Sequence, residues 1–218
     1  KTNGNETAFY LAFVHGHSNV VKVLMDNAGI DLNLDREYAF RGWTVFHEAC
    51  KLGHSDVVKI LMENPATFNV DLTEKDILGR TTFHYACQSG PLDVVKFFME
   101  KAAALNVNLH DIEKNGRTAF HLACRRGNSD VVKIFLGNAS TLGFDFNKKD
   151  TEGWTGFIWA CQEGNSNVVK LLMENASALN IDLNRQITVG NVTKVIQLWC
   201  RSGIKETMKL RKLIKGSK

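Results

Sequence analysis

The side chains with the most reactive chemistry are histidines and cysteines, and both types recur every 37 residues. The histidines on this period are His47, His84 and His121, and the cysteines on it are Cys50, Cys87, Cys124 and Cys161. Imidazole and thiolate groups bind zinc, and a paired cysteine and histidine can act as a nucleophile and its base. Zinc needs four ligands at about 2.0 to 2.3 Å, so residues one repeat apart cannot converge on it. We therefore predict that both sets are structural, with no catalytic residue, bound metal or cofactor.

The same interval governs the segments around these residues. The sequence at 42–47 reads GWTVFH, and it returns as GRTTFH at 79–84, GRTAFH at 116–121 and GWTGFI at 153–158. A period between about 20 and 50 residues indicates one supersecondary unit stacked on copies of itself. Such arrays usually bind other molecules and rarely catalyse reactions.

Each unit can be divided into two helices and a linker. Thr44 is a good N-cap for a short helix that Gly53 ends, and a second helix follows with an apolar face that includes Val57 and Ile60. Lys59 and its equivalents lie between apolar pairs, so we expect them to face solvent. The polar linker at 71–76 then closes the unit.

This pattern resembles the ankyrin repeat family, whose Gly-x-Thr-Pro-Leu-His motif is similar to the sequence at 42–47. The resemblance implies an all-α protein, an ankyrin-type helix-turn-helix solenoid with short extended hairpin or finger linkers. Two departures are systematic. No proline stands in the first helical turn, and leucine is replaced by phenylalanine at Phe46, Phe83, Phe120 and Phe157, which indicates a bulkier internal stack.

The period divides the chain into a single ankyrin-type array over residues 1–218. Its parts are an atypical repeat 1 at 1–41, repeats 2 to 5 at 42–78, 79–115, 116–152 and 153–189, and a degenerate basic capping repeat at 190–218. The usual repeat of the family has 33 residues, so each unit has four more. Four residues make about one helical turn, and we predict that the second helix is longer by that turn. In repeat 1 the second helix should be short and the following loop large.

The resemblance also implies a non-catalytic scaffold that binds a protein or peptide on its concave face and finger tips. We expect the binding residues at positions that vary between repeats while the scaffold stays fixed. On the inner helices these are Glu48, Tyr85, Gln88, Leu122, Arg125, Arg126, Trp159 and Gln162, and on the finger tips Trp43, Arg80, Arg117 and Trp154. Tyr85, Leu122 and Trp159 make the best single patch, because aromatic residues and arginines are enriched at binding hot spots. On this hypothesis Trp159→Ala weakens binding and leaves thermal unfolding nearly unchanged. The alternative is that the rings pack on the adjacent finger.

Composition limits the function further. The chain is 44% hydrophobic, which excludes general disorder, and no apolar run approaches the roughly 18 residues of a membrane span. The net charge is +4, but residues 185–218 carry +8, which leaves −4 for the first 184 residues. A slightly acidic body argues against nucleic acid as a partner. We interpret the basic end as a solvated capping helix, with an address signal, an acidic-lipid patch or a nucleic-acid contact as alternatives.

The sequence also bears on cellular location and on self-association. The cysteines suit a reduced, intracellular and cytoplasmic protein, although the first residue is Lys1 rather than Met, so a removed leader or a longer parent protein stays open. The first repeat begins with an apolar helix, with Phe9 and Phe13, and no capping repeat stands before it in this sequence. An alternative function is therefore a structural subunit that self-associates end to end or side by side into an oligomer or filament.

Overall fold

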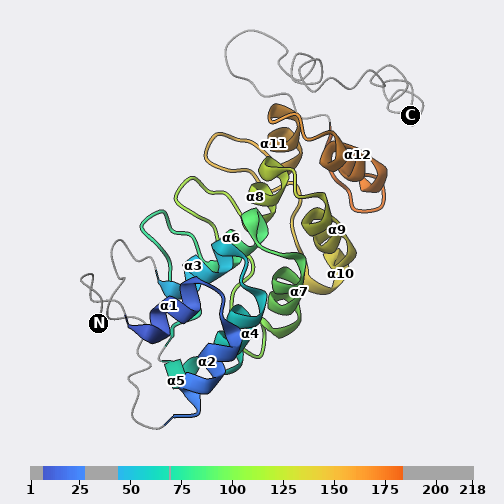
Figure 1. Cartoon of the computed structure of the whole chain (residues 1–218). Helices are drawn as coiled ribbons and strands as arrows, with labels where there is room; N and C mark the ends of the chain where they lie inside the picture. Colours follow the sequence, from blue (N-terminus) through green and yellow to red (C-terminus); the bar gives the residue numbers. More distant parts are fainter. Residues whose placement is uncertain (1–6, 28–43, 69, 184–218) are drawn as a thin grey trace. The chain divides into compact units, whose positions relative to one another are not determined.

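The computed structural model describes residues 7–27, 44–68 and 70–183, and these residues form twelve helices and no strand. The chain divides into two compact units, residues 1–119 and 120–218, and each is described by itself (Figure 1). Trp43, the large loop expected after the first repeat and the degenerate repeat at 190–218 lie outside the described residues.

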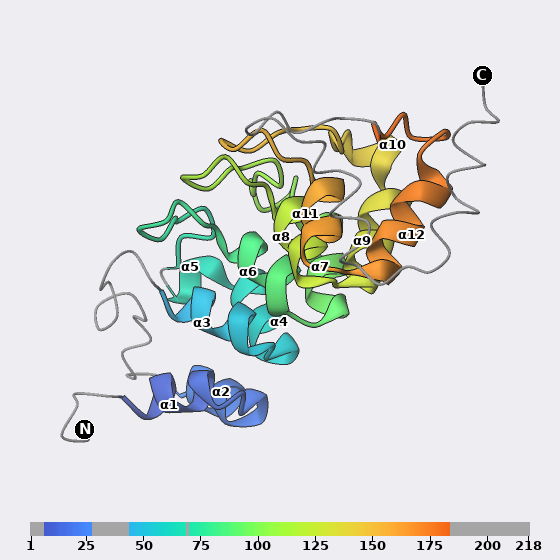
Figure 2. The ribbon, with the colours of Figure 1, turned by 90° about the horizontal axis from the view of Figure 1, so that it is seen from above.

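The first unit contains three helix pairs and one extra helical turn. Its helices are α1 (Ala8–Val14), α2 (Ser18–Met25), α3 (Val45–Leu52), α4 (Ser55–Glu63), α5 (Pro65–Phe68), α6 (Thr82–Ser89) and α7 (Leu92–Lys101). The first helices of the pairs, α1, α3 and α6, contact one another in sequence order, and the second helices α2, α4 and α7 do the same (Figures 1 and 2). The unit is therefore a two-layer stack of antiparallel pairs.

The second unit repeats this plan. It contains α8 (Ala119–Arg126), α9 (Ser129–Gly137), α10 (Ala139–Leu142), α11 (Gly156–Gln162) and α12 (Ser166–Asn175). Helices α9 and α12 are in contact, as are α11 and α12. Gly156, at the start of α11, lies so close to α8 that a Cβ atom there would be 2.6 Å from the ring of Phe120. Apart from the single turns α5 and α10, the described helices of both units thus follow the helix-turn-helix pattern expected from the sequence.

The helix ends confirm most of the predicted caps. Thr44 and Thr155 lie at the N-caps of α3 and α11, where their hydroxyl groups accept backbone N–H bonds from the third helical residue. Gly53 ends α3 in the left-handed conformation, with φ of 82°, as predicted for a glycine C-cap. Gly90 ends α6 with an extended backbone instead, because it precedes Pro91 and the residue before a proline avoids helical angles.

The phenylalanines form the core as predicted. Phe46, Phe83, Phe120 and Phe157 are all buried. Within the first unit, Phe68 of α5 stacks on Phe9 at 5.5 Å between ring centroids and meets Phe13 edge-on at 5.8 Å. The extra turn of repeat 2 therefore covers the apolar side of α1.

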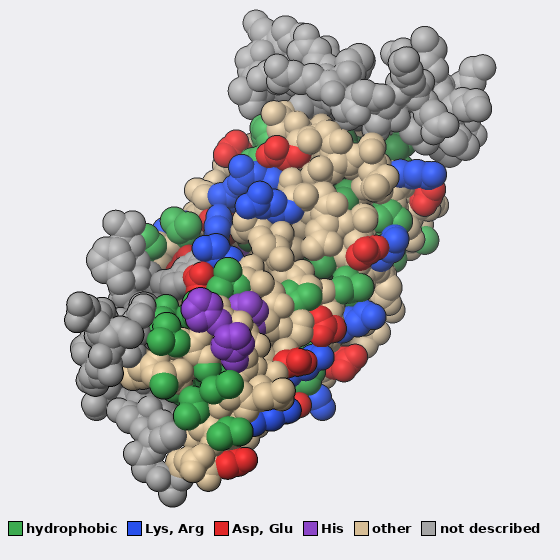
Figure 3. Space-filling model, in the orientation of Figure 1, with side chains coloured by type: hydrophobic (Ala, Val, Ile, Leu, Met, Phe, Trp, Pro, Cys, Tyr) green, Lys and Arg blue, Asp and Glu red, His purple; other side chains and the backbone are tan. Residues whose placement is uncertain are grey.

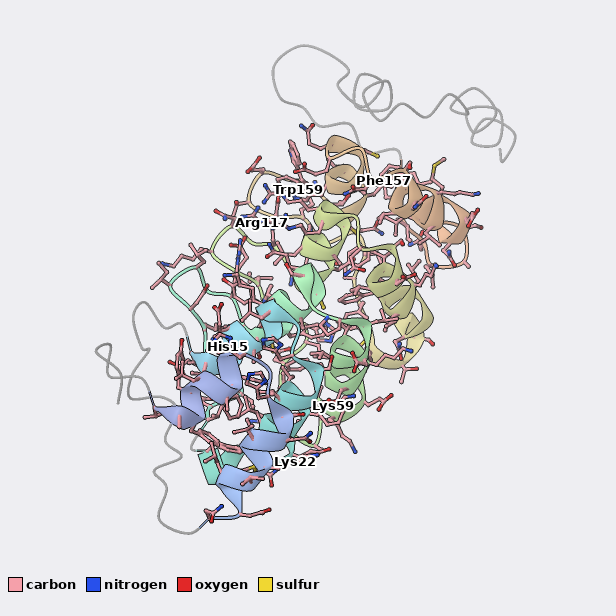
Figure 4. All side chains as sticks on the ribbon, in the orientation of Figure 1. His15, Lys22, Lys59, Arg117, Phe157 and Trp159 are labelled. Atoms are coloured by element: carbon pink, nitrogen blue, oxygen red, sulfur yellow. The ribbon has the colours of Figure 1, made fainter. Side chains whose placement is uncertain are left out.

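The prediction of a longer second helix is wrong. In repeats 2 and 4 the helix ends at Asn64 and Asn138, whose side-chain amides donate to the carbonyl oxygens four residues earlier, and the added residues form the separate turns α5 and α10. In repeats 3 and 5 the ten-residue helices α7 and α12 pass into turns that end at the left-handed residues Asn106 and Asn180. The second helix of repeat 1, α2, has eight residues and is short, as expected. Lys59 lies on the outer surface, where its ammonium group pairs with Asp93 at 3.0 Å (Figure 4).

The three repeated histidines connect neighbouring repeats. In His47 and His84 the Nδ1 atom accepts the backbone N–H of the N-cap threonine, at 3.2 and 3.1 Å. Nε2 therefore carries the proton and donates to the carbonyl oxygens of Arg80 and Arg117, one repeat further on. In the second unit, Nε2 of His121 lies 3.1 Å from the carbonyl oxygen of Trp154. The structural role predicted for this histidine ladder (His47, His84 and His121) is confirmed.

The ladder should make the first unit sensitive to mild acid. Burial lowers the pKa of His84 from 6.5 to about 4 and also lowers that of His47. Between pH 6.5 and about pH 4, His84 is protonated in the unfolded chain but neutral in the folded chain. Its contribution to stability is therefore fully present above pH 6.5 and falls as the pH falls. A histidine with the pKa of His84 should reduce the free energy of unfolding by about 2 kcal/mol between pH 7 and pH 5.

Urea unfolding at pH 7 and pH 5, in wild type and His84→Gln, measures this effect. The variant should be less stable at pH 7 but should lose about 2 kcal/mol less between the two pH values. If the free energy of unfolding has the same pH dependence in wild type and variant, His84 is not its cause.

Candidate functional site

The described linkers project as fingers, and each is organised around a buried carboxylate. In the first of these fingers, Asp76 Oδ1 accepts the backbone N–H groups of Leu78 and Arg80 at 2.9 and 2.8 Å. The hydroxyl group of Tyr85, from α6, donates to Asp76 Oδ2 at 2.6 Å. Burial, with a contribution from this bond, raises the pKa of Tyr85 to about 12, so the hydroxyl keeps its proton and remains a donor.

The next finger replaces each member of this set. Glu113 takes the place of Asp76, and it is buried. Leu122 stands at the position of Tyr85 and has no group that can donate. The guanidinium group of Arg117 donates instead, with Nε 2.7 Å from Glu113 Oε1 (Figure 4 labels Arg117). The ion pair between Glu113 and Arg117, both in the same finger, thus replaces the hydrogen bond that Tyr85 makes to Asp76 and that Leu122 cannot make.

The finger of the second unit returns to the first arrangement. Asp150 Oδ1 accepts the backbone N–H groups of Glu152 and Trp154, both at 2.9 Å, and the indole N–H of Trp159 donates to Oδ2 at 2.8 Å. Trp154 packs on Trp159, with ring centroids 4.6 Å apart. Trp159 lies on the side of α11 that faces this finger (Figure 4).

The expectation that Tyr85, Leu122 and Trp159 form an exposed patch is wrong. Their exposed fractions are 6%, 2% and 7%. The two aromatic residues are turned toward their own fingers because each satisfies a buried carboxylate, and leucine is buried because it needs no polar partner. The expectation that Trp159→Ala leaves thermal unfolding nearly unchanged does not fit this structure either, because Trp159 is buried and donates to Asp150. The alternative interpretation, in which the rings pack on the fingers, describes the structure.

The residues assigned to the finger tips lie at the base of the fingers. Asp76 and Arg80 face each other, with the N–H of Asp76 donating to the carbonyl oxygen of Arg80, and the turn between them closes at Gly79. Arg117 and Trp154 occupy the same position after Gly116 and Gly153. The tips are therefore residues 77–79, 114–116 and 151–153.

The other predicted site residues form two groups, one in each unit. In the first unit Arg80 lies 5.6 Å from the ring centroid of Tyr85 and donates to the side-chain amide of Gln88 at 3.5 Å, while Glu48 lies 4.0 Å from Lys51. Glu48 and Gln88 are half-buried.

In the second unit Arg125 lies 4.8 Å from the ring centroid of Trp159 and pairs with Glu163 at 3.1 Å. Arg126 is exposed, and Gln162 and Trp154 are half-buried. This group places Arg125 over a tryptophan stack, with Arg126 as the next residue of α8.

A family model described as "Ankyrin repeats (3 copies)" matches residues 33–111 and 103–187. The chain belongs to the ankyrin repeat family. A search of curated proteins finds no match. Ankyrin repeats generally mediate interactions between proteins and are typically non-catalytic, and the chemistry of this chain is consistent with that role.

The four cysteines that the structure describes in this ankyrin chain are buried, free and unreactive. Burial raises the pKa of Cys161 to about 12 and raises those of Cys50, Cys87 and Cys124 above the ordinary value as well, so none is a thiolate at neutral pH. In the described part of the chain, no group of three or more histidine, cysteine or acidic side chains could hold a metal ion. No helix described here is long and apolar enough to cross a membrane.

Sequence reasoning missed the carboxylates Asp76, Glu113 and Asp150, and Glu163 beside Arg125. A signal for the first three was present. At positions 76, 113 and 150 an acidic residue recurs every 37 residues, and it is Asp where the residue nine positions later is Tyr or Trp, but Glu where that residue is Leu.

Replacement of the finger set in repeat 5 should test this coupling. Trp159→Leu removes a donor from the buried carboxylate of Asp150 and should reduce the free energy of unfolding by about 3 kcal/mol. The triple variant Asp150→Glu, Trp154→Arg, Trp159→Leu installs the set found at Glu113, Arg117 and Leu122, and should recover part of that loss. Urea unfolding measures both. If the triple variant is less stable than the single one, the three positions are not coupled in this way.

Proposed function

We propose that this ankyrin chain is a non-catalytic scaffold that binds a protein partner through a surface of its second unit. The surface consists of Arg125, Arg126, Trp154 and Gln162, with Glu163 at its edge, and is called the arginine surface below. The observation that carries the proposal is the position of Arg125, whose side chain is 42% exposed although it is stacked over Trp159 and paired with Glu163.

An arginine held in this way has already lost much of its freedom. Long side chains cost about 0.5 to 1.5 kcal/mol when binding immobilises them, and prior ordering removes part of this cost. The planar guanidinium group can still bind a carboxylate with its remaining donors. Arginine and tryptophan are also the residues most enriched at binding hot spots. The partner that fits is a protein segment with a carboxylate close to an apolar or aromatic side chain.

Substitution at the arginine surface tests the proposal. In a partner complex recovered from the source cells, Arg125→Ala with Arg126→Ala should weaken binding at least tenfold, or about 1.4 kcal/mol, as measured by calorimetry. Lys133→Ala is the matched control, because Lys133 is an exposed cation on α9 that is paired within its own helix. Equal effects of the two variants on Kd would refute a specific role for the surface.

We do not propose nucleic acid as a partner. The same calorimetric measurement, repeated at increasing salt, addresses this point, because nucleic-acid binding weakens steeply with salt as condensed counterions are released.

We further propose a cytoplasmic location, which the four free, buried cysteines support and which imaging of a tagged full-length protein would check.

A second candidate function is self-association, and the outer side of α2 favours it. Val20 is 47% exposed and Val23 is 61% exposed, and Figure 3 shows apolar side chains at the surface over α1 and α2. The residues equivalent to Val20 in the later repeats are all 0% exposed: Val57, Val94, Val131 and Val168. In the first unit α2 lies against α4, and α4 lies against α7. A second helix of the same type is therefore the natural cover for α2.

Sedimentation velocity over a range of concentrations tests this candidate. Wild type should form larger species as the concentration rises, and Val20→Lys with Val23→Glu should remain monomeric because it places charges in the contact. Leu52→Lys is the control, since Leu52 is 46% exposed on α3 and lies outside the contact. A wild type that stays monomeric throughout would remove self-association as a function.

A further inference from the structure

The two described fingers in the first unit expose apolar side chains that nothing in the fold requires, two at the tip of one finger and one before the carboxylate of the next. Ile77 is 42% exposed, Leu78 is 40% exposed and Ile112 is 45% exposed. The equivalent positions in the finger of the second unit are exposed as well, but there they hold Thr151, Glu152 and Lys149. The same finger geometry thus accepts fully polar residues. The apolar residues of the first unit therefore need an explanation outside the fold.

These side chains belong to one surface because the two fingers lie side by side (Figures 1 and 2). Lys75 Nζ lies 2.8 Å from Asp111 Oδ1, and the backbone N–H of Lys114 donates to the carbonyl oxygen of Leu78 at 2.8 Å. Ile112 follows Asp111 in one finger, and Ile77 lies between Lys75 and Leu78 in the other. Both contacts have an offset of 36 residues, so Ile112 stands opposite Asp76, one residue along from Ile77.

The tip is held rigidly before any partner arrives. Asp76 accepts two backbone N–H groups from the turn, and Gly79 closes it with φ of 77° and an N–H bond to the carbonyl oxygen of Asp76. A Cβ atom on Gly79 would lie 3.3 Å from the backbone nitrogen of Lys114, so the two fingers are also closely packed. Binding at a preorganised tip avoids most of the entropy cost of ordering a loop.

The charges around the tip select the kind of partner. Residues 71–80 and 108–117 hold five acidic and four basic side chains, so the surface does not attract an anionic membrane or nucleic acid. Lys75 is paired with Asp111, and Arg117 with Glu113. Among the described residues of these two fingers, Lys114 is an exposed cation with no carboxylate partner.

We propose that the finger-tip cluster, formed by Ile77, Leu78, Ile112 and Lys114, docks a protein segment that presents an apolar side chain next to a carboxylate. The apolar side chain packs on the isoleucines and leucine, and the carboxylate pairs with Lys114. The cluster belongs to the first unit and does not depend on the arginine surface of the second, so either proposal can fail without the other.

Methyl NMR of the full chain tests the proposal with two blocked heptapeptides of the same length. One has the core Leu-Phe-Asp and the other Leu-Phe-Lys. The methyl signals of Ile77 and Ile112 should shift with the aspartate peptide, and Kd should be at least fivefold higher for the lysine peptide. In Lys114→Gln this preference should disappear, while in the Arg125→Ala, Arg126→Ala variant it should persist.

The matched control for the apolar side chains is Ile77→Thr with Leu78→Glu, which installs the residues found at Thr151 and Glu152. Its unfolding midpoint should equal that of wild type, and the shift at Ile112 should be lost. Unmoved methyl signals in wild type, or equal Kd values for the two peptides, would overturn the proposal. It would also be overturned by concentration-dependent shifts of these methyls without peptide, which indicate a second copy, or by Ile77-dependent binding to phosphatidylserine vesicles.

Discussion

The three described fingers depend on a carboxylate that is buried at the base of each one. A finger has too few apolar residues to form a core of its own, and its backbone must still return to the next helix at a defined place. Asp76 and Asp150 each accept two backbone N–H groups from the turn and one donor from the following helix. An unpaired buried carboxylate costs several kcal/mol, so the finger can open only by losing all these bonds together. The histidine ladder then fixes the finger to the repeat before it.

Because each buried carboxylate needs a donor, residue differences between repeats do not by themselves indicate a binding surface. Tyr85, Leu122 and Trp159 are dissimilar, and dissimilar residues at one repeat position suggest a surface shaped for a partner. In the structure they vary together with a residue nine positions earlier, because a carboxylate needs a donor and leucine offers none. Variation at this position is therefore compensated inside the protein. Exposed positions outside this carboxylate set, such as Arg126, are the ones at which function can differ more freely.

Much of the fold could be predicted because a repeat multiplies weak local signals. A threonine before an apolar segment and a glycine after it are weak evidence once, but strong evidence at four equal intervals. Burial of the phenylalanines and the role of His47 followed from the same regularity. The longer second helix could not be predicted from length alone, because Asn64 caps the helix with its own side chain and Pro65 begins a new turn. The burial of Trp159 was missed because periodicity shows which residues share a face, but not which hydrogen bond turns a ring toward its own finger.

The division between scaffold and surface also explains why the finger tips can change character within one chain. Asp76 and Asp150 make the same backbone bonds, yet the residues between those bonds are Ile77 and Leu78 in one finger and Thr151 and Glu152 in the other. Because the turn is held by the carboxylate and by Gly79 or Gly153, the intervening side chains contribute little to its stability. An apolar tip on such a turn gains nothing for folding and exposes surface that water solvates poorly. The exposure of Ile77 and Leu78 at this tip, with Ile112 exposed on the adjacent finger, is therefore best explained by a contact that removes this surface from water.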